Sequence, residues 1–233
     1  MVRIFLYITM LLLPTAVMAQ SNWELPKEQQ KTDVSKNNKN TKSNDKKDKY
    51  LSVKDTNTGK TYTINEADRP YLKGAVPEID GQVIFSKEIN TKGISASEAY
   101  EKLYSKLESL TKDKNQTERS KIAIVNKKKH SIVATFEEWL VFTDKIFVLD
   151  RAKFNYVLIA DCFDGKVNIS ISRLSYEYGE GKNSEHLVAE KLITDKLMLT
   201  NEGTKLKNTN KKYRKATVNR INEVLSFIES SFK

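Results

Sequence analysis

Two alternating segments joined by a two-residue turn constrain the fold of this chain more than any other feature of its sequence. The first, FNYVLIADCF, ends at Phe163, and the second, KVNISISRLSYEY, begins at Lys166. Between them stands the pair Asp164 and Gly165, which is typical of a tight β-hairpin turn. The turn length predicts an antiparallel register with these partners: Phe163 and Lys166, Cys162 and Val167, Ala160 and Ile169, Leu158 and Ile171.

The predicted register gives the hairpin two different faces, because successive side chains of a strand point to opposite sides. One face is almost entirely apolar and is expected to pack against helices. The other face is half polar, and it carries Val157, Ile159, Ser170 and Ser172. A half-apolar face left to water is a candidate contact surface. We therefore expect it to meet another protein chain.

A strand and a helix are predicted before this hairpin. VIFSKEI, residues 83–89, alternates as a strand does. Ser95 followed by Glu98 forms a capping box, in which the hydroxyl accepts from a free backbone amide and the carboxylate reaches back. Apolar residues then recur at helical spacing, which predicts a helix from Ala96 to Leu110.

A second pair of strands is predicted between that helix and the hairpin. SKIAIVN and SIVATF flank the turn sequence KKKH, and EEWLVF extends the second strand through a bulge at Glu137 or Glu138. A register that gathers the apolar side chains on one face follows from the turn. Its expected partners are Asn126 and His130, Ile124 and Ile132, and Ile122 and Ala134.

Two helices and a basic segment are predicted at the C-terminal end. EHLVAEKLI predicts a short helix, and TVNRINEVLSFIESSF, residues 217–232, places its apolar residues on one stripe. The segment between them is expected to be irregular. It is the best candidate for contact with an anionic envelope surface, such as phosphate head groups or acidic glycans. Its basic residues are Lys205, Lys207, Lys211, Lys212, Arg214 and Lys215.

The order of elements is strand, helix, four strands, helix, with a small hairpin and a loop in front over residues 50–70. Consecutive antiparallel strands with one apolar face need helices on that face only. The sequence therefore predicts an α+β fold: a curved antiparallel sheet with helices on one face and an open, partly polar opposite face.

Residues 1–19 have the features of a secretory signal peptide. Arg3 supplies a short positive region, IFLYITMLLL is apolar, and small residues lead to Ala19. The apolar run is too short to favour a membrane anchor, and no cysteine follows Ala19 to carry a lipid. Residues 20–49 are polar and rich in lysine and asparagine, which predicts a disordered linker because such a segment cannot bury enough apolar area.

These features predict an exported chain, periplasmic or extracellular, with association with the outer membrane left open. No second apolar run of about twenty residues occurs, so no transmembrane segment is expected after signal removal. The formal net charge of +10 is compatible with anionic lipid or acidic polysaccharide as a partner and selects neither. Nucleic acid is the least favoured partner of an exported protein.

The sequence offers little material for catalysis or metal binding. A single cysteine, Cys162, rules out an internal disulfide, and the register places it on the apolar face. The two histidines, His130 and His186, are expected in an exposed turn and near a helix start. Glu137 and Glu138 are neighbours in one strand and so face opposite ways. Because no catalytic, cofactor or metal motif is recognised, we expect no enzyme, no cofactor and no metal.

Several longer motifs resemble those of a known family. They are YLKGAVPEIDGQVIFSKEI, then LVFTDKIFVLDRAKFNYVLIADCFDGKVNISISRLSYEYGE, then AEKLITDKLMLTNEGTKL, and YRKATVNRINEVL. As a set they resemble exported bacterial domains of unknown function that are described as having a TATA-binding-protein-like fold. The resemblance implies that fold for residues 71–233. It implies no activity and no catalytic residue, and the fold name is an analogy of shape that does not imply DNA binding.

The sequence is most consistent with an exported, non-catalytic binding or structural module of the bacterial cell envelope. Its partner would be an unknown envelope protein or a second copy of the chain. Two alternatives stay open, namely a hydrolase acting on an envelope polymer and a carrier of a small ligand.

Overall fold

The computed structural model describes residues 49–54, 59–145, 148–179 and 184–233. The predicted signal peptide, residues 1–19, and all of the predicted linker except Lys49 lie outside the described residues. The Lys49 carbonyl accepts a hydrogen bond from the Glu66 amide at 2.8 Å, so this last linker residue is tied to the fold. The predicted small hairpin pairs β1 (Tyr50–Lys54) with β2 (Thr61–Asn65).

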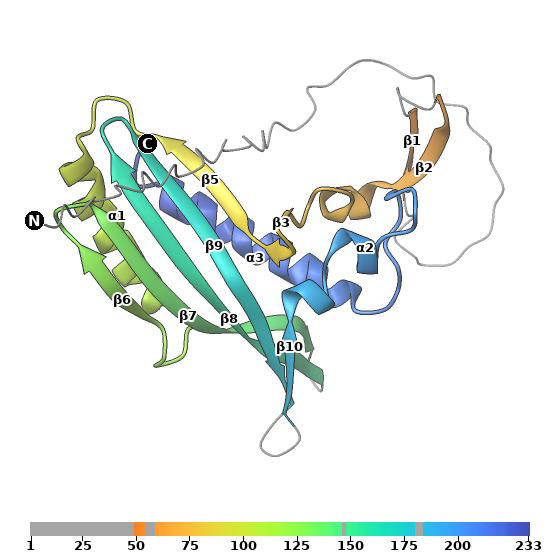
Figure 1. The fold of residues 1–233 in the computed structure, drawn as a ribbon. Coiled ribbons are helices and arrows are strands. Elements are labelled where there is room, and N and C mark those ends of the chain that lie inside the picture. Colours follow the sequence, from red (N-terminus) through yellow and green to blue (C-terminus); the bar gives the residue numbers. More distant parts are fainter. Residues whose placement is uncertain (1–48, 55–58, 146–147, 180–183) are drawn as a thin grey trace, which may run out of the picture. The chain divides into compact units, whose positions relative to one another are not determined.

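A curved sheet of six antiparallel strands forms the centre of the fold (Figure 1). The strands run in the order β10-β9-β8-β7-β6, and β5 also pairs with β9. Since β8 occupies one edge of β9, β5 and β10 share the other edge, one beside each end of β9. Their bounds are β5 Phe85–Asn90, β6 Lys121–Asn126, β7 Ser131–Lys145, β8 Val148–Phe163, β9 Lys166–Tyr178 and β10 Glu185–Val188.

The long hairpin β8–β9 has the predicted register at its turn. All four predicted pairs, from Phe163 and Lys166 to Leu158 and Ile171, are observed. Gly165 has a φ of +78°, which a glycine adopts without strain. The turn also caps a helix, because Asp164 Oδ1 accepts from the Ala96 amide at 2.8 Å and the Gly165 amide donates to the Ile94 carbonyl at 3.0 Å.

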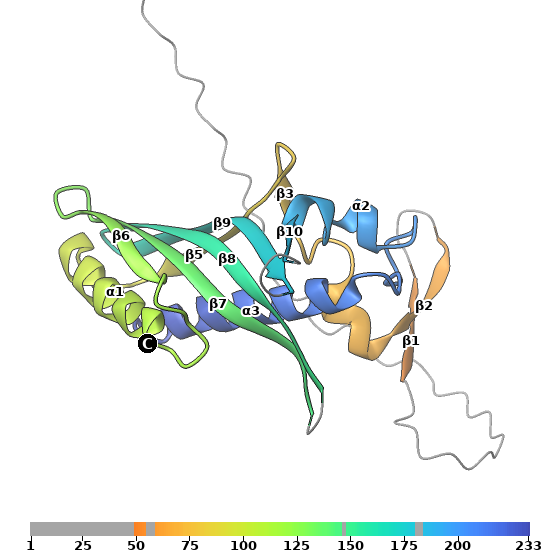
Figure 2. The same cartoon turned by 90° about the horizontal axis from the view of Figure 1, so that it is seen from below.

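Two helices cover one face of the sheet, as predicted (Figure 2). Helix α1 (Ala96–Thr111) begins at the Ser95 cap, whose hydroxyl accepts from the Glu98 amide at 3.3 Å. Helix α3 (Lys211–Glu229) packs beside it. Their buried residues include Leu103, Leu107, Ile221 and Ile228, which join the core side chains of β7, β8 and β9 in one cluster. The opposite face carries no helix in the described part of the chain.

The β6–β7 pair differs from the predicted register near its turn. Asn126 pairs with Ser131 rather than His130, because its Oδ1 accepts from the Lys129 amide at 3.0 Å and closes a longer turn. His130 takes a left-handed φ of +52° in that turn. A bulge between Ile122 and Ile124 then absorbs the shift, so that Ile122 still faces Ala134 as predicted.

The segment EHLVAEKLI was predicted as a helix, and that prediction is wrong. Its first four residues form strand β10, followed by a 3-10 turn at Ala189–Lys191. The strand forms because β5 covers only the first part of β9 and leaves the edge beside Ser175 to Tyr178 free for pairing. Such long-range pairing overrides a weak local preference.

Two other parts of the chain are more regular than predicted. Helix α3 begins at Lys211, within the segment that was expected to be irregular. Between the first hairpin and β5, a 3-10 helix, Glu66–Tyr71, includes Pro70, and the short strands β3 (Glu78–Ile79) and β4 (Gln82–Val83) pair with each other.

The bulge expected at Glu137 or Glu138 occurs instead between Val141 and Thr143.

Candidate functional site: a polar pocket on the open sheet face

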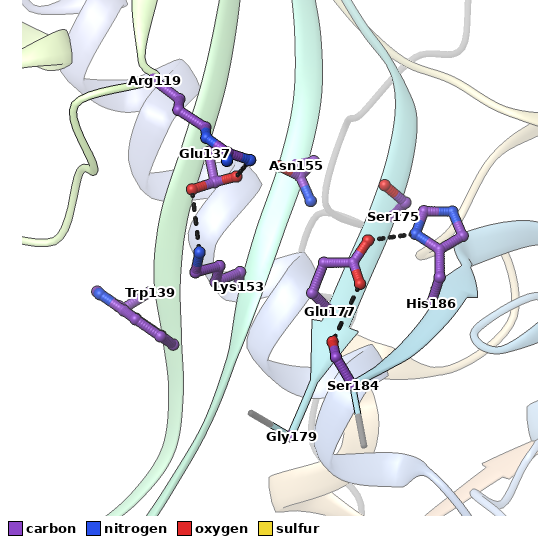
Figure 3. A pocket seen from close by; sticks show the side chains of 10 residues that line it. All are labelled: Arg119, Glu137, Trp139, Lys153, Asn155, Ser175, Glu177, Gly179, Ser184 and His186. Atoms are coloured by element: carbon purple, nitrogen blue, oxygen red, sulfur yellow. Dashed lines mark hydrogen bonds and ion pairs between the residues drawn. The ribbon is translucent and has the colours of Figure 1, made fainter. Parts of the chain in front are cut away.

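Two rows of side chains cross the open face where β7, β8, β9 and β10 lie next to one another. Neighbours in each row are partners on adjacent strands. The first row is Trp139, Lys153, Glu177 and His186, and the second is Glu137, Asn155 and Ser175. Together with Arg119, Gly179 and Ser184, they line a pocket of about 670 Å³ (Figure 3).

On one side of the pocket, Glu137 is held by three donors. Arg119 Nη1 lies 3.2 Å from one carboxylate oxygen, and Lys153 Nζ lies 3.5 Å from the other, which also accepts from Thr117 Oγ1 at 2.9 Å. The segment after α1 brings Thr117 and Arg119 into place, because the Thr117 amide donates to the Glu137 carbonyl at 2.8 Å, while Lys153 projects from β8. The Glu137 side chain is 9% exposed, so these contacts fix its carboxylate.

On the other side of the pocket, Glu177 joins β9 to β10. Its Oε1 lies 2.5 Å from His186 Nδ1, and its Oε2 accepts from Ser184 Oγ at 3.3 Å (Figure 3). His186 therefore lies in a strand, on the open face, and not near a helix start as the sequence suggested. In a nucleophilic triad the serine hydroxyl bonds to the histidine, whereas here Ser184 bonds to the carboxylate.

Trp139 supplies the aromatic side chain of the pocket. The guanidinium carbon of Arg151 lies 3.7 Å from the centre of its ring, and Lys153 Nζ lies 5.7 Å from it. Stacked cations of this kind stabilise an indole ring. The two cations therefore hold the ring in place.

Aromatic residues on the covered face support the same strands from below. Phe136 stacks on Tyr156 with ring centres 4.9 Å apart, and Phe154 stacks on Tyr176 at 5.3 Å. The Tyr176 hydroxyl is 2.7 Å from Thr217 Oγ1 on α3. The pocket therefore rests on a packed layer. Seven of its ten lining residues project from strands, whereas Arg119, Gly179 and Ser184 come from connecting segments.

The lining mixes charges of both signs with neutral polar groups. Two carboxylates stand beside a lysine and an arginine, so neither a purely anionic nor a purely cationic ligand is favoured. Among the described residues, no group of three or more histidine, cysteine, aspartate or glutamate side chains is placed to hold a metal ion. The arrangement can offer many hydrogen bonds and one aromatic surface.

The predicted contact residues lie on the same open face, next to the pocket. Val157, Ser170 and Ser172 are half-buried, and Ile159 is 38% exposed. Val157 pairs with Ser172, and Ile159 pairs with Ser170. We call this set the half-apolar patch. The register places all four side chains where the sequence predicted, while their role in contact stays a prediction.

The predicted basic surface loses a central member, because Arg214 is fully buried. Its guanidinium donates to the carbonyls of Tyr71, Leu72 and Ile193 and pairs with Asp195. An arginine at a buried helix position escaped prediction because sequence patterns count it as polar.

The other basic residues divide into two groups. Lys212 pairs with Asp150 at 2.8 Å, and Lys215 pairs with Asp68. Lys205, Lys207 and Lys211 are exposed. The six residues therefore do not act as one uniform cationic surface.

Two predictions about individual side chains are confirmed. Cys162 is buried, 2% exposed, on the covered face. Glu137 and Glu138 face opposite ways: Glu138 is 1% exposed and pairs with Arg220 on α3 at 2.7 Å. The two carboxylates therefore belong to different environments and do not act together.

The sequence contained one signal for the pocket that the predicted register did not use. Apolar residues of β9 stand at Ile169 and Ile171 and then at Leu174 and Tyr176, so the alternation changes phase. The change marks a bulge at Arg173, whose φ is +55°. Without that bulge Leu174 and Tyr176 would face the open side, whereas with it Ser175 and Glu177 do.

Comparisons with known proteins agree with this architecture. A family model described as "Domain of unknown function (DUF4468) with TBP-like fold" matches residues 85–177. The crystal structure of a DUF4468 family protein from Bacteroides ovatus has 32% sequence identity over 71% of this chain and 94% of that chain, with a TM-score of 0.66. The chain belongs to this family. The family and the α+β fold expected from the sequence motifs are thereby confirmed.

A second solved structure shares the DUF4468 fold at lower identity. A TBP-like protein from Parabacteroides distasonis has 19% sequence identity over 68% of this chain and 97% of that chain, with a TM-score of 0.55. Comparison with curated proteins gave no match. Within the described residues, none of the helices is both long and apolar enough to cross a membrane.

Proposed function

We propose that this DUF4468 protein is an exported, non-catalytic binding module of the bacterial cell envelope, and that the open sheet face is its working surface. The observation that carries the proposal is the pocket: ion-paired and aromatic side chains stand preformed on the sheet face that none of the described helices covers. Preformed sites bind at a lower entropic cost. Export is supported by the signal pattern of residues 1–19.

The half-apolar patch beside the pocket supports contact with a protein partner, either an envelope protein or a second copy. Ile159 is the exposed apolar side chain of the patch, and the alternating serines limit how strongly the patch can bind. The exposed lysines Lys205, Lys207 and Lys211 support a weaker alternative, which is contact with an anionic surface.

Binding is favoured over hydrolysis by the connectivity of the pocket. Ser184 is not bonded to His186, and both pocket carboxylates are engaged by neighbouring side chains in the resting structure. The hydrolase alternative would be supported if the protein released soluble fragments from purified envelope polymer, and if Glu177→Gln abolished that release.

Export and envelope association are tested together in the native host. Intact mass of the protein recovered from the envelope fraction should lack residues 1–19. Purified protein should also co-sediment with envelope extract, and Ile159→Lys should weaken this association about tenfold. Leu197→Lys is the matched control, because Leu197 is exposed to a similar degree, 42%, on helix α2 (Asp195–Met198).

Two results would contradict the proposal. One is protein that is found only in the cytoplasmic fraction with residues 1–19 still attached, which would mean that it is not exported. The other is wild-type protein that stays in the supernatant at every concentration of extract. Both variants should remain within about 1 kcal/mol of wild type in free energy of unfolding, as is usual for surface changes.

A further inference from the structure

We infer that the pocket on the open face binds an uncharged saccharide. The inference rests on the proposed function, since it assumes that this face is a binding surface, and it adds the chemical class of the ligand. It concerns the pocket alone and not the half-apolar patch. Four features of the pocket lead to it.

The first feature is the lack of aliphatic side chains in the lining. Apart from Trp139 and Gly179, every lining residue has a polar or charged side chain. A peptide with several apolar side chains would find only Trp139 here to bury them against. Most small-ligand pockets are predominantly apolar with few polar groups, so this lining fits a ligand that is itself covered with hydroxyl groups.

The second feature is the balance of charge. Glu137 and Glu177 would repel a phosphate or a sulfate, while Arg119 and Lys153 would repel a dication. An uncharged ligand avoids both penalties. Carboxylates accept hydrogen bonds from hydroxyl groups, and lysine and arginine donate to hydroxyl oxygens. Such bonds to charged groups are stronger than bonds between neutral groups.

The third feature is the placement of Trp139 at one end of the row that leads through Lys153 and Glu177 to His186. A sugar ring presents C–H groups on its faces and hydroxyls around its edge. The Trp139 ring can pack against the C–H groups, while the polar side chains in the row bind the hydroxyls. Arg151 already stacks on the indole, so little ordering of Trp139 is needed on binding.

The fourth feature is size. A volume of about 670 Å³ lies within the range of about 300–1,000 Å³ that small-ligand sites occupy. Seven of the ten lining residues stand on four adjacent strands, which suits an extended ligand lying across the sheet. We therefore expect an oligosaccharide to bind more tightly than a single sugar.

Tryptophan fluorescence offers a direct test. The sequence has two tryptophans, Trp23 and Trp139, so Trp23→Phe in the full chain leaves Trp139 as the single reporter. The probes are uncharged tetrasaccharides built from glucose, mannose, galactose or N-acetylglucosamine, with inorganic phosphate and a sulfated tetrasaccharide as charged probes. At least one uncharged tetrasaccharide should change the emission saturably below about 10 mM, a limit that includes millimolar affinities. The charged probes should not do so.

Variants then assign the binding to the pocket. Asn155→Ala and Glu137→Gln should each weaken binding of the best tetrasaccharide by about tenfold or more, because each removes a hydrogen-bonding group that contacts the ligand. Ser170→Ala, on the same face outside the pocket, should change binding by less than about twofold. Circular dichroism and thermal unfolding check that each variant is folded. If Glu137→Gln does not fold, the result for Asn155→Ala alone tests the inference.

The outcomes separate this inference from the proposed function. If envelope association persists but no uncharged tetrasaccharide binds, or a charged probe binds at Trp139 instead, the saccharide inference is wrong and the binding function stands. If Asn155→Ala binds the sugar as well as wild type does, the sugar lies outside the pocket and the inference is again wrong. If the protein neither associates with envelope nor binds sugar, both fail.

Discussion

Arg214 connects three segments that are far apart in the sequence. From α3 its guanidinium reaches the Tyr71 and Leu72 carbonyls, the Ile193 carbonyl and the Asp195 carboxylate, which also accepts from the Gly74 amide at 2.7 Å. Since Arg214 is fully buried, removing it would take this donor away from the Tyr71 and Ile193 carbonyls and leave the Asp195 carboxylate without its cation. Only a planar group with several donors can satisfy them together.

Replacing Arg214 should therefore be costly. We expect Arg214→Met to lower the free energy of unfolding by about 3–5 kcal/mol, the usual effect of removing one member of a buried ion pair. Arg214→Lys should recover only part of this loss. Urea titration measures the effect, with Lys205→Met as the exposed control. A loss below about 1 kcal/mol would mean that water replaces the guanidinium.

Cys162 should be protected from thiol reagents in the native state. Burial raises the pKa of its thiol to about 12, with a smaller contribution from Asp161. A raised pKa means that almost no reactive thiolate is present at pH 8. Labelling at that pH should be slow without denaturant and fast in urea. Fast labelling of folded protein would show that the β8–β9 hairpin opens easily.

At the scale of elements, local signals in the sequence set the long hairpin and helix α1. The Asp164 and Gly165 turn fixes the pairing near it, and the Ser95 cap fixes the start of the helix. Strand β10 and the first turn of α3 could not be predicted this way. The first depends on a free edge of β9, and the second on carbonyls that surround Arg214. The pocket depends on both kinds of information. The change of alternation at Arg173 is a local signal that the predicted register did not use, whereas His186 joins the pocket only through the pairing of β10 with β9.

The bulge at Arg173 offers a test of this explanation. Its φ of +55° is accessible to glycine but strained for other residues, most of all for β-branched ones. Arg173→Val should be less stable than Arg173→Gly by about 1–2 kcal/mol. Ser172 lies one residue earlier and has no positive φ. The free energy of unfolding of Ser172→Val should therefore differ from that of wild type by less than about 1 kcal/mol. Equal stability of both Arg173 variants in urea titration would indicate that the bulge moves along the strand.

At the scale of the whole molecule, the described fold begins at Lys49. The polar composition of residues 20–48 provides no side chains for a core. Deleting residues 20–48 should shift the midpoint of thermal unfolding by less than about 2 °C, whereas a loss of 1 kcal/mol would shift it by about 2–4 °C for a domain of this size. Differential scanning calorimetry measures the shift. A fall of several degrees would show that the segment docks on the fold.

The turn between β8 and β9 bears on how quickly the chain folds. Asp164 belongs to the hairpin, yet its carboxylate also caps α1 through the Ala96 amide, so the helix gains a partner as soon as the turn closes. Hairpins close in about 1–10 μs, before distant segments meet. We expect Asp164→Ala to slow refolding with little change in the unfolding rate, while Asp164→Asn, which keeps an oxygen acceptor, refolds at nearly the wild-type rate. Stopped-flow refolding and unfolding experiments measure the two rates. If the turn and the helix meet only after the rate-limiting barrier, Asp164→Ala will instead unfold faster and refold at the wild-type rate.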